Sequence, residues 1–195
     1  MGKLVYLIGR SSSGKDTIFK RLMEWDEICF QKVVTYTTRP IRANEKEGEE
    51  YHFTDESGYL KLEEAGKVIE SRVYDTCHGL WRYFTADDGS FSFEKNNYLI
   101  IGTLESFNKT ADYFGRENVL PVLLELDDGI RLQRALQREM EQEQPKYEEL
   151  CRRFLADAKD FSPENVQNAG ITKTFNNDDL ERCLLEIKEY IRKEL

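Results

Sequence analysis

The stretch LVYLIGRSSSGKDT, residues 4–17, decides the fold of this chain. Its first part, from Leu4 to Ile8, is a continuous apolar run, which is typical of a parallel strand buried on both faces. From Lys15 to Trp25, apolar residues return at helical spacing, so we expect a helix directly after the loop. A buried strand, a glycine loop and a helix in this order predict a phosphate-binding loop in an α/β protein.

The loop fits the first seven positions of the pattern GxxxxGK followed by Ser or Thr. Glycines let the backbone curl until successive N–H groups face inward, and the helix N-terminus adds partial positive charge. Lys15 can then neutralise the β- and γ-phosphates of ATP during transfer. The alternative, an incidental glycine- and serine-rich turn, does not account for the flanking strand and helix. The predicted ATP-binding residues here are Gly9, Arg10, Ser11, Ser12, Ser13, Gly14, Lys15, Asp16 and Thr17, with Lys15 also catalytic.

Asp16 occupies the position at which this pattern has a Ser or Thr hydroxyl on Mg²⁺. A carboxylate is also a hard oxygen ligand, so we expect Asp16 to hold the ion directly or through water. Thr17 points about 100° away along the helix and is not a simple replacement. Mg²⁺ is thus the expected cofactor beside ATP, with Asp16 as its candidate ligand.

Beyond the loop, the sequence predicts strands that alternate with helices, which implies a parallel sheet between helices. Further core strands are expected near residues 30–35, 98–101, 119–126 and 171–175. Helices are expected at residues 104–114, 129–142 and 146–160, and after Asn177 or Asp178, either of which can cap the last helix. Short strands at residues 51–54, 68–74 and 80–85, around a helix near residues 57–65, break the rhythm and indicate an inserted lobe.

The predicted fold class is therefore α/β: a P-loop three-layer α/β/α core with a parallel sheet, a small inserted mixed β lobe and a helical lid. We expect one domain over residues 1–195. Its core is assigned to residues 1–34, 94–127 and 161–195, the lobe to about residues 35–93, and the lid to about residues 128–160.

Composition restricts the class of partner. The 37 acidic and 28 basic residues give a formal charge of −9, which argues against a general nucleic-acid binder. Four scattered cysteines, Cys29, Cys77, Cys151 and Cys183, indicate reduced thiols in a cytoplasmic protein. The short apolar start is not long enough for a membrane span, so no membrane partner is expected, and both a monomer and a homodimer stay open.

A second motif begins at residue 35. Residues 35–42, TYTTRPIR, are followed by Glu45, Gly48 and the YHF of residues 51–53. This segment resembles the GMP-binding segment of guanylate kinases, which typically reads S-x-T-T-R-x-x-R and then E-x-x-G-x-x-Y-x-F. Together with the phosphate loop, the arginine-rich helices and residues 176–180, the similarity covers nearly the whole chain. The resemblance implies a kinase that transfers a phosphoryl group from ATP to a nucleoside monophosphate, with GMP as the leading acceptor.

The resemblance also implies acceptor-binding residues. It implies that the GMP phosphate is held by Arg39, Arg42 and Tyr51. Two arginines and a phenol are suited to bind a monoester dianion. Arg39 is also taken as catalytic. For the base, the implied residues are Thr35, Glu70, Tyr83 and Thr85. The alternatives are that the arginines are ordinary surface charges, that Glu70 is a structural ion-pair partner, and that Tyr83 and Thr85 are simple strand residues.

Arginines dominate the two helices assigned to the lid. Arg131, Arg134 and Arg138 recur on the first, and Arg152 and Arg153 lie on the second. The resemblance makes Arg138 and Arg153 the catalytic pair that neutralises the transferred phosphoryl group. It also places Asn176 or Asn177 at the adenine of ATP, the alternative being that both are ordinary helix caps. Solvated helices with internal ion pairs are the alternative for the arginines.

Three departures keep other functions open. Phe84 replaces a glycine of the family pattern, residues 74–79 are additional, and Gly102-Thr103-Leu104-Glu105 stands where guanylate kinases usually present a D-x-D pair. The GKD of the loop, the His78-Gly79 pair and Gly102-Thr103 resemble the ribose bisphosphate kinases of the phosphonate pathway. A third alternative is a non-catalytic guanylate-kinase-like binding module, although such modules commonly have a degraded phosphate loop.

Overall fold

The computed structural model describes residues 1–42, 45–76 and 79–195, with only the backbone of residue 76. Its larger sheet has the strand order β2-β7-β1-β8-β9, and all four pairings are parallel. The strands are β1 (Leu4–Gly9), β2 (Phe30–Lys32), β7 (Asn97–Gly102), β8 (Val119–Glu125) and β9 (Thr174–Asn176). Strand β1 is central and buried along its whole length, which explains its uninterrupted apolar sequence.

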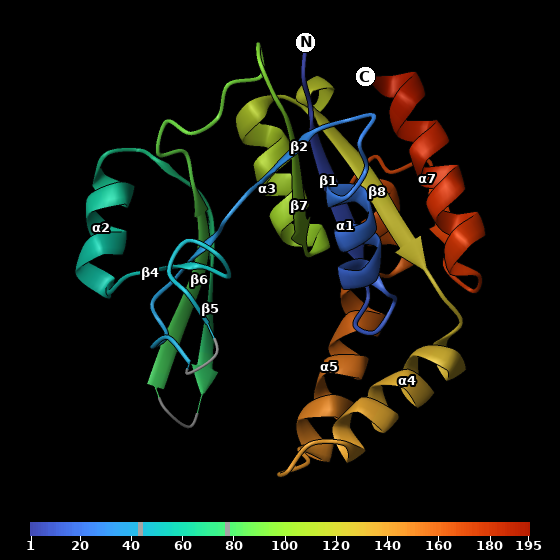
Figure 1. Cartoon of the computed structure of the whole chain (residues 1–195). Coiled ribbons are helices and arrows are strands. Elements are labelled where there is room, and N and C mark those ends of the chain that lie inside the picture. The colour runs from blue at the N-terminus through green and yellow to red at the C-terminus, as the bar shows by residue number, and fades with distance from the viewer. Residues whose placement is uncertain (43–44, 77–78) are drawn as a thin grey trace.

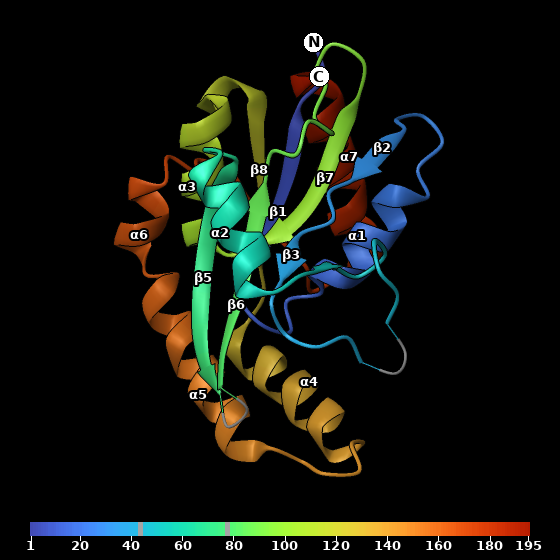
Figure 2. The same cartoon turned by 90° about the vertical axis from the view of Figure 1, so that its left-hand side faces the viewer.

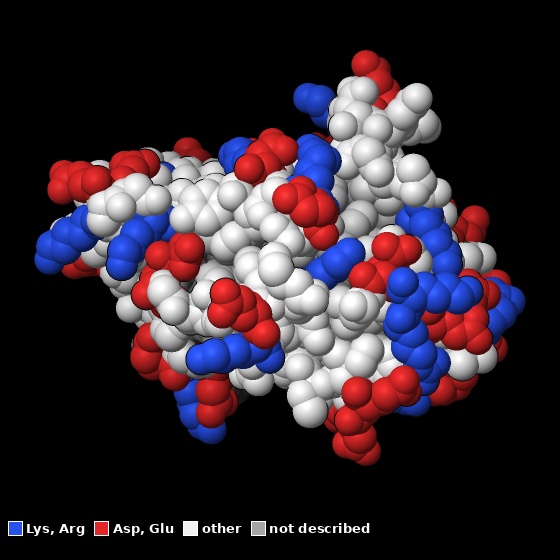
Figure 3. All heavy atoms as spheres, turned by 90° about the horizontal axis from the view of Figure 1, so that it is seen from above, with Lys and Arg blue, Asp and Glu red and all other residues white. Residues whose placement is uncertain are grey.

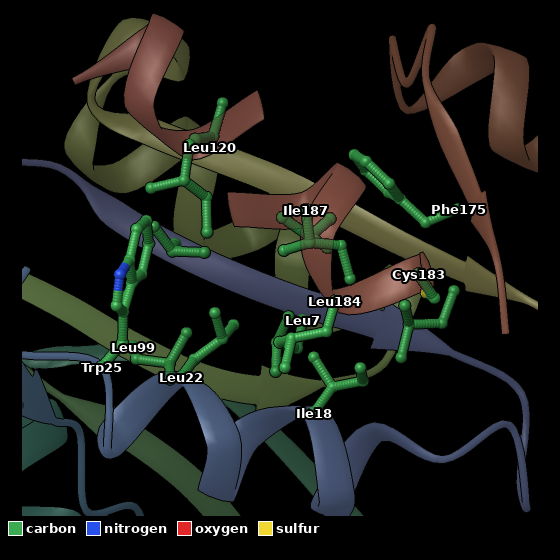
Figure 4. Packing of buried hydrophobic residues seen from close by; sticks show 14 of the residues in the cluster. Leu7, Ile18, Leu22, Trp25, Leu99, Leu120, Phe175, Cys183, Leu184 and Ile187 are labelled. Carbon is green, nitrogen blue, oxygen red and sulfur yellow. The ribbon is translucent and has the colours of Figure 1, made fainter. Parts of the chain in front are cut away.

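Helices cover both faces of this sheet (Figure 1). On one face, α1 (Lys15–Met23) and α7 (Leu180–Glu194) pack through Ile18, Leu22, Leu184 and Ile187 against inward residues such as Leu7 (Figure 4). On the other face, α3 (Leu104–Phe114) packs against alternate residues of the same strand, such as Leu4 and Tyr6. Because successive strand residues point to opposite faces, one short strand anchors both layers.

A smaller, separate sheet forms the inserted lobe. Its order is β4-β3-β6-β5, with β3–β4 parallel and the other two pairings antiparallel. The strands are β3 (Tyr36–Thr37), β4 (His52–Phe53), β5 (Val68–Thr76) and β6 (Gly79–Ala86). Helix α2 (Glu56–Glu64) covers one face (Figure 2). Its Tyr59 packs edge-on against Phe84 there, with ring centroids 5.0 Å apart. The opposite face of β5 and β6 is left for the candidate site.

The remaining helices follow the carboxyl end of β8. They are α4 (Asp128–Met140), α5 (Tyr147–Asp160) and α6 (Pro163–Asn168), and a short 3-10 helix η1 (Arg116–Asn118) precedes β8. Helices α4 and α5 lie beneath the sheet in Figure 1, beside the loop that follows β1. The parallel sheet between helical layers, with a separate mixed β sheet, confirms the predicted fold class.

Some predicted elements shift in the structure. The expected strand at residues 30–35 ends at Lys32, and the chain then enters the other sheet at Tyr36. The last strand lies at Thr174–Asn176, three residues later than the start predicted. Neither Asn177 nor Asp178 caps α7: the side chain of Asp179 does so, accepting from the Arg182 N–H at 2.9 Å. Helix α6, with Pro163 in its first turn, was not predicted.

Charged residues of both signs are interspersed on the face seen in Figure 3. Some form exposed ion pairs that join α1 or the loop after it to α7, as Arg21–Glu181 does at 2.8 Å. Such pairs contribute little to stability. No helix within the described residues has the length and apolar character needed to cross a membrane. Cys29, Cys151 and Cys183 are free thiols, and Cys77 lies outside the described residues.

Candidate functional site

The loop between β1 and α1 turns sharply at Gly14, whose φ of 92° lies in the left-handed region that favours glycine. A Cβ atom at Gly14 would lie 2.3 Å from the side-chain nitrogen of Asn177, so a side chain is also excluded by space. Helix α1 begins at the next residue. Its first N–H groups and partial positive charge are therefore directed toward the loop, as phosphate binding requires.

Lys15 is held against the loop. Its Nζ donates to the carbonyl oxygens of Gly9 at 2.7 Å and Arg10 at 2.8 Å. Burial lowers the pKa of Lys15, because desolvation disfavours the charged ammonium. A bound polyphosphate would favour the charged ammonium, because its negative charge replaces the hydration that Lys15 loses on burial.

Residues distant in sequence hold the backbone of the loop. Asn177 is buried and donates from Nδ2 to the Ser13 carbonyl at 2.8 Å. The Ser11 N–H donates to Asp157 at 2.7 Å. Arg131, only 1% exposed, donates to the Ser11 carbonyl at 3.0 Å and lies 3.4 Å from Asp157. These three residues therefore hold the loop through its backbone.

An open pocket of about 370 Å³ lies over the start of α1. It is lined by Ser12, Gly14, Lys15, Asp16, Thr17, Arg134, Arg138, Asn177 and Leu180. Arg138 approaches from α4 and donates to the Ser12 hydroxyl at 3.3 Å. Basic groups from two elements thus meet a helix N-terminus, an arrangement suited to a nucleotide polyphosphate.

The structure places the other predicted residues of this site outside the pocket lining. Arg10 donates to the Phe161 carbonyl at 2.9 Å. Ser13 is buried with its backbone held by Asn177, and the exposed Asn176 ends β9. Arg153 is exposed on α5 and lies 3.7 Å from Glu149. Of the two arginines predicted to be catalytic, Arg138 lines the pocket and Arg153 does not.

Arg39 is a buried charged residue of the inserted lobe, 3% exposed. Its guanidinium donates to both oxygens of Glu45, at 2.5 and 2.7 Å, which lowers the pKa of Glu45 to about 2. The Arg39 Nε is buried and has no hydrogen-bond partner within the described residues. The guanidinium carbon lies 5.2 Å from the Tyr51 ring centre. Arg39 therefore keeps donor capacity in a polar, aromatic environment.

Arg42, Tyr51 and Tyr83 complete this cluster. Arg42 is exposed and donates its backbone N–H to Glu45 at 2.9 Å, so Glu45 joins both arginines. The Tyr51 and Tyr83 rings meet edge-on at 5.6 Å. Burial raises the pKa of Tyr51, so its hydroxyl stays a donor at neutral pH. The structure thus brings together the residues expected to hold the acceptor phosphate.

Glu70 and Thr85 face each other across the β5–β6 pair, and the Thr85 hydroxyl donates to Glu70 at 2.9 Å. Glu70 also forms an ion pair with Arg72, whose Nε lies 3.0 Å from the carboxylate. Thr35 is half-buried before β3, where its carbonyl accepts from the His52 N–H at 2.8 Å. His78 lies outside the described residues.

Four residues beside the predicted site were missed by the sequence prediction in part or in whole. Asn177 rather than Asn176 reaches the loop, and Arg131 and Asp157 act as its braces. Arg72 is the fourth, and one signal was available for it. A basic residue two positions after Glu70 on a strand lies on the same face as the carboxylate.

Comparison with known proteins gives this geometry a context. A family model described as guanylate kinase matches residues 1–78. A guanylate kinase from Thermotoga maritima is 28% identical over 205 aligned positions, which span 96% of this chain and 97% of that protein. One from Paraburkholderia xenovorans is 34% identical over 87 residues, 44% of this chain and 38% of the length of that protein.

A solved structure agrees over nearly the full length. The crystal structure of guanylate kinase from Anaplasma phagocytophilum aligns with 99% of this chain and 86% of that chain. The TM-score is 0.63 and the sequence identity is 24%. The two proteins therefore share their fold.

Proposed function

The chain belongs to the guanylate kinase family, and we propose that it transfers the γ-phosphoryl group of ATP to GMP, giving ADP and GDP. One observation carries the proposal. A formed phosphate loop with a half-buried lysine occurs in the same chain as a buried arginine whose Nε is unpaired among the described residues and whose guanidinium lies against the Tyr51 ring. The first suits a donor polyphosphate and the second suits a phosphate monoester.

On the donor side, the loop and α1 bind the β- and γ-phosphates. Lys15 leaves the Gly9 and Arg10 carbonyls to neutralise the charge that develops on the transferred group. Arg134 and Arg138 line the same pocket and supply further positive charge from α4. These groups stabilise the transition state by position and charge and form no covalent bond with it.

On the acceptor side, an oxygen of the GMP phosphate attacks the γ-phosphorus of ATP. The bond from that phosphorus to the β–γ bridging oxygen breaks, and ADP leaves. Arg39 and Arg42 hold the attacking phosphate, with Tyr51 as a neutral donor. Because the Arg39 guanidinium already donates to Glu45, the GMP phosphate displaces that carboxylate from Arg39 when it binds.

The residues at the loop also fit Mg²⁺. Asp16 is exposed in the first turn of α1 and lines the pocket with Lys15 and Thr17. Mg²⁺ commonly takes one or two carboxylates, phosphate oxygens and several waters, so a single protein carboxylate is adequate. When bound, the ion would neutralise the β- and γ-oxygens of ATP. Asp16 would hold it directly or through water.

A coupled assay of ADP release tests the proposal. Mg·ATP is offered with GMP, dGMP, AMP, UMP or ribose 1,5-bisphosphate in turn, and we expect turnover with GMP well above the others. If only ribose 1,5-bisphosphate is turned over, the sugar bisphosphate and not GMP is the acceptor. A folded protein that turns over none of them would contradict a kinase function and favour a binding module.

A further inference from the structure

Glu70 is not accessible to an acceptor in this structure. Its side chain is 1% exposed, against 20% for that of Arg72. One carboxylate oxygen accepts from Thr85 at 2.9 Å and from Arg72 Nη2 at 3.3 Å, and the other accepts from Arg72 Nε at 3.0 Å. A carboxylate offers about four acceptor positions, so three are already taken. Guanine needs two more for its N1–H and 2-amino group.

Arg72 instead faces a pocket that Glu70 does not line. This pocket, of about 630 Å³, lies between β5 and the helices α3 and α6. Its lining includes Arg72 and Tyr74 of β5, Glu105 and Asn108 of α3, Asp160 at the end of α5, and Asn165 and Asn168 of α6. The Arg72 Nη1 makes no hydrogen bond within the part of the chain that the structure describes. Both N–H groups of Nη1 and the second N–H of Nη2 therefore have no partner among the described residues, which leaves a donor pair on the outer edge of the guanidinium.

The charge of the pocket discriminates between ligands. Arg72 is balanced by Glu70, Glu105 is balanced by Lys109 at 2.7 Å, and Asp160 adds a negative charge. This setting is unfavourable for a second phosphate dianion. The uncharged amides of Asn108, Asn165 and Asn168, with the half-exposed ring of Tyr74, suit a neutral heteroaromatic ring that presents hydrogen-bond acceptors.

We propose that Arg72 reads the base of the acceptor by donating to O6 and N7 of guanine, while Glu70 and Thr85 act as positioning residues that hold the guanidinium. This inference deepens the proposed function and rests on it. Arginine matches the O6 and N7 pair of guanine in a bidentate manner. Adenine presents a 6-amino donor at the place of O6, which would meet the guanidinium donor to donor.

The proposal orders three nucleotides without any variant. Hypoxanthine keeps O6 and N7 and lacks only the 2-amino group. If Arg72 is the reader, the wild-type protein should bind IMP within about fivefold of GMP and bind AMP about tenfold more weakly or worse. Had Glu70 been the reader, loss of the 2-amino group would cost IMP much of its affinity. An IMP as weak as AMP would overturn the proposal.

Calorimetric titration of GMP, IMP and AMP into full-length variants is the second arm. Arg72→Met should raise the GMP Kd by about 10- to 100-fold with little change for AMP. Arg72→Lys keeps Glu70 paired but loses the planar fork, so it should give most of the same loss in a protein of normal melting temperature. GMP binding within twofold of wild type by either folded variant would overturn the proposal.

Arg82→Met is the matched control. Arg82 has a similarly exposed side chain, 21%, and a carboxylate partner, Glu56, at 2.6 Å, but it lies on the α2 face over Tyr59. We expect the GMP-to-AMP affinity ratio to stay at the wild-type value. Normal GMP turnover without a change of preference in the Arg72 variants would overturn this inference alone. Absence of GMP turnover by the wild-type protein would overturn the proposed function.

Discussion

The phosphate loop and the acceptor lobe are prepared for their ligands in different ways. The loop is held through its backbone, with Asn177, Arg131 and Asp157 bonded to the main chain of Ser11 and Ser13. The acceptor lobe relies on charged side chains that already have partners, Arg39 with Glu45 and Arg72 with Glu70. A ligand at the loop meets an open, electropositive pocket, whereas a ligand at the lobe meets arginines that already pair with carboxylates.

This difference predicts where mutations act. Loss of a group at the loop removes stabilisation that is strongest in the transition state, so kcat should fall. Loss of a group in the lobe removes ground-state binding and frees a buried carboxylate, so the KM for the acceptor should rise.

Lys15→Ala should give the largest effect. We expect kcat to fall by about 10²- to 10³-fold or more, because one preorganised electrostatic contact to the transition state is lost. The coupled assay measures the rate, and thermal melting should show a folded protein. Lys20→Ala, at an exposed position on the same helix, is the control and should stay near wild type. Comparable rates for both variants would refute the role of the loop.

Arg39→Ala should act on the acceptor alone. We expect the GMP KM to rise by about 10- to 100-fold, since a charge-assisted contact to the phosphate is removed. The KM for ATP should change little, because Arg39 does not line the loop pocket. Initial rates at varied GMP and ATP separate the two constants. An equal rise in both would erase the contrast between loop and lobe.

Asn177→Ala tests the bracing of the loop. The Ser13 carbonyl would lose its donor, at a cost of about 1–3 kcal/mol in the free energy of unfolding. The KM for ATP should rise a few-fold and the KM for GMP should not. Asn176→Ala, at the exposed neighbouring position, should have the smaller effect on both quantities. The reverse order would place the adenine-side asparagine at residue 176.

The Arg39–Glu45 pair should give the smallest effect, visible in its pH dependence. The folded-state pKa of Glu45 is lowered from 4.5 to about 2 by Arg39, so the pair stabilises the fold above pH 4.5. That contribution is lost as the pH falls toward 2. Glu45→Gln should therefore melt a few degrees below wild type at pH 6, with the gap closing below pH 4.5. A gap that widens on acidification would contradict this sign.

The sequence predicted the site best where its residues are contiguous in the chain. The loop, its lysine and the flanking strand and helix lie within residues 4–23, and their order determines their geometry. The braces are different, because Arg131 and Asp157 reach Ser11 across 120 and 146 residues of chain. No local pattern specifies such contacts. They depend on how α4 and α5 pack after the sheet has formed.

The sequence predicted which residues gather in the lobe, but not which of them form ion pairs and hydrogen bonds with one another. The motif of residues 35–53 located Arg39, Arg42 and Tyr51, and the structure gathers them. That Glu70 would be enclosed by Arg72 and Thr85 follows from the β5–β6 register, which includes an irregularity between Val68 and Glu70. Register is a tertiary property, since a slip of one residue reverses every side chain.

We propose above all that this chain moves a phosphoryl group from ATP to GMP. Phosphorus NMR of purified protein with Mg·ATP and GMP tests it most directly. We predict that the GMP and γ-phosphate signals decline together while ADP and GDP appear in equal amounts. Unchanged spectra, or ADP formed with inorganic phosphate and no GDP, would contradict the claim.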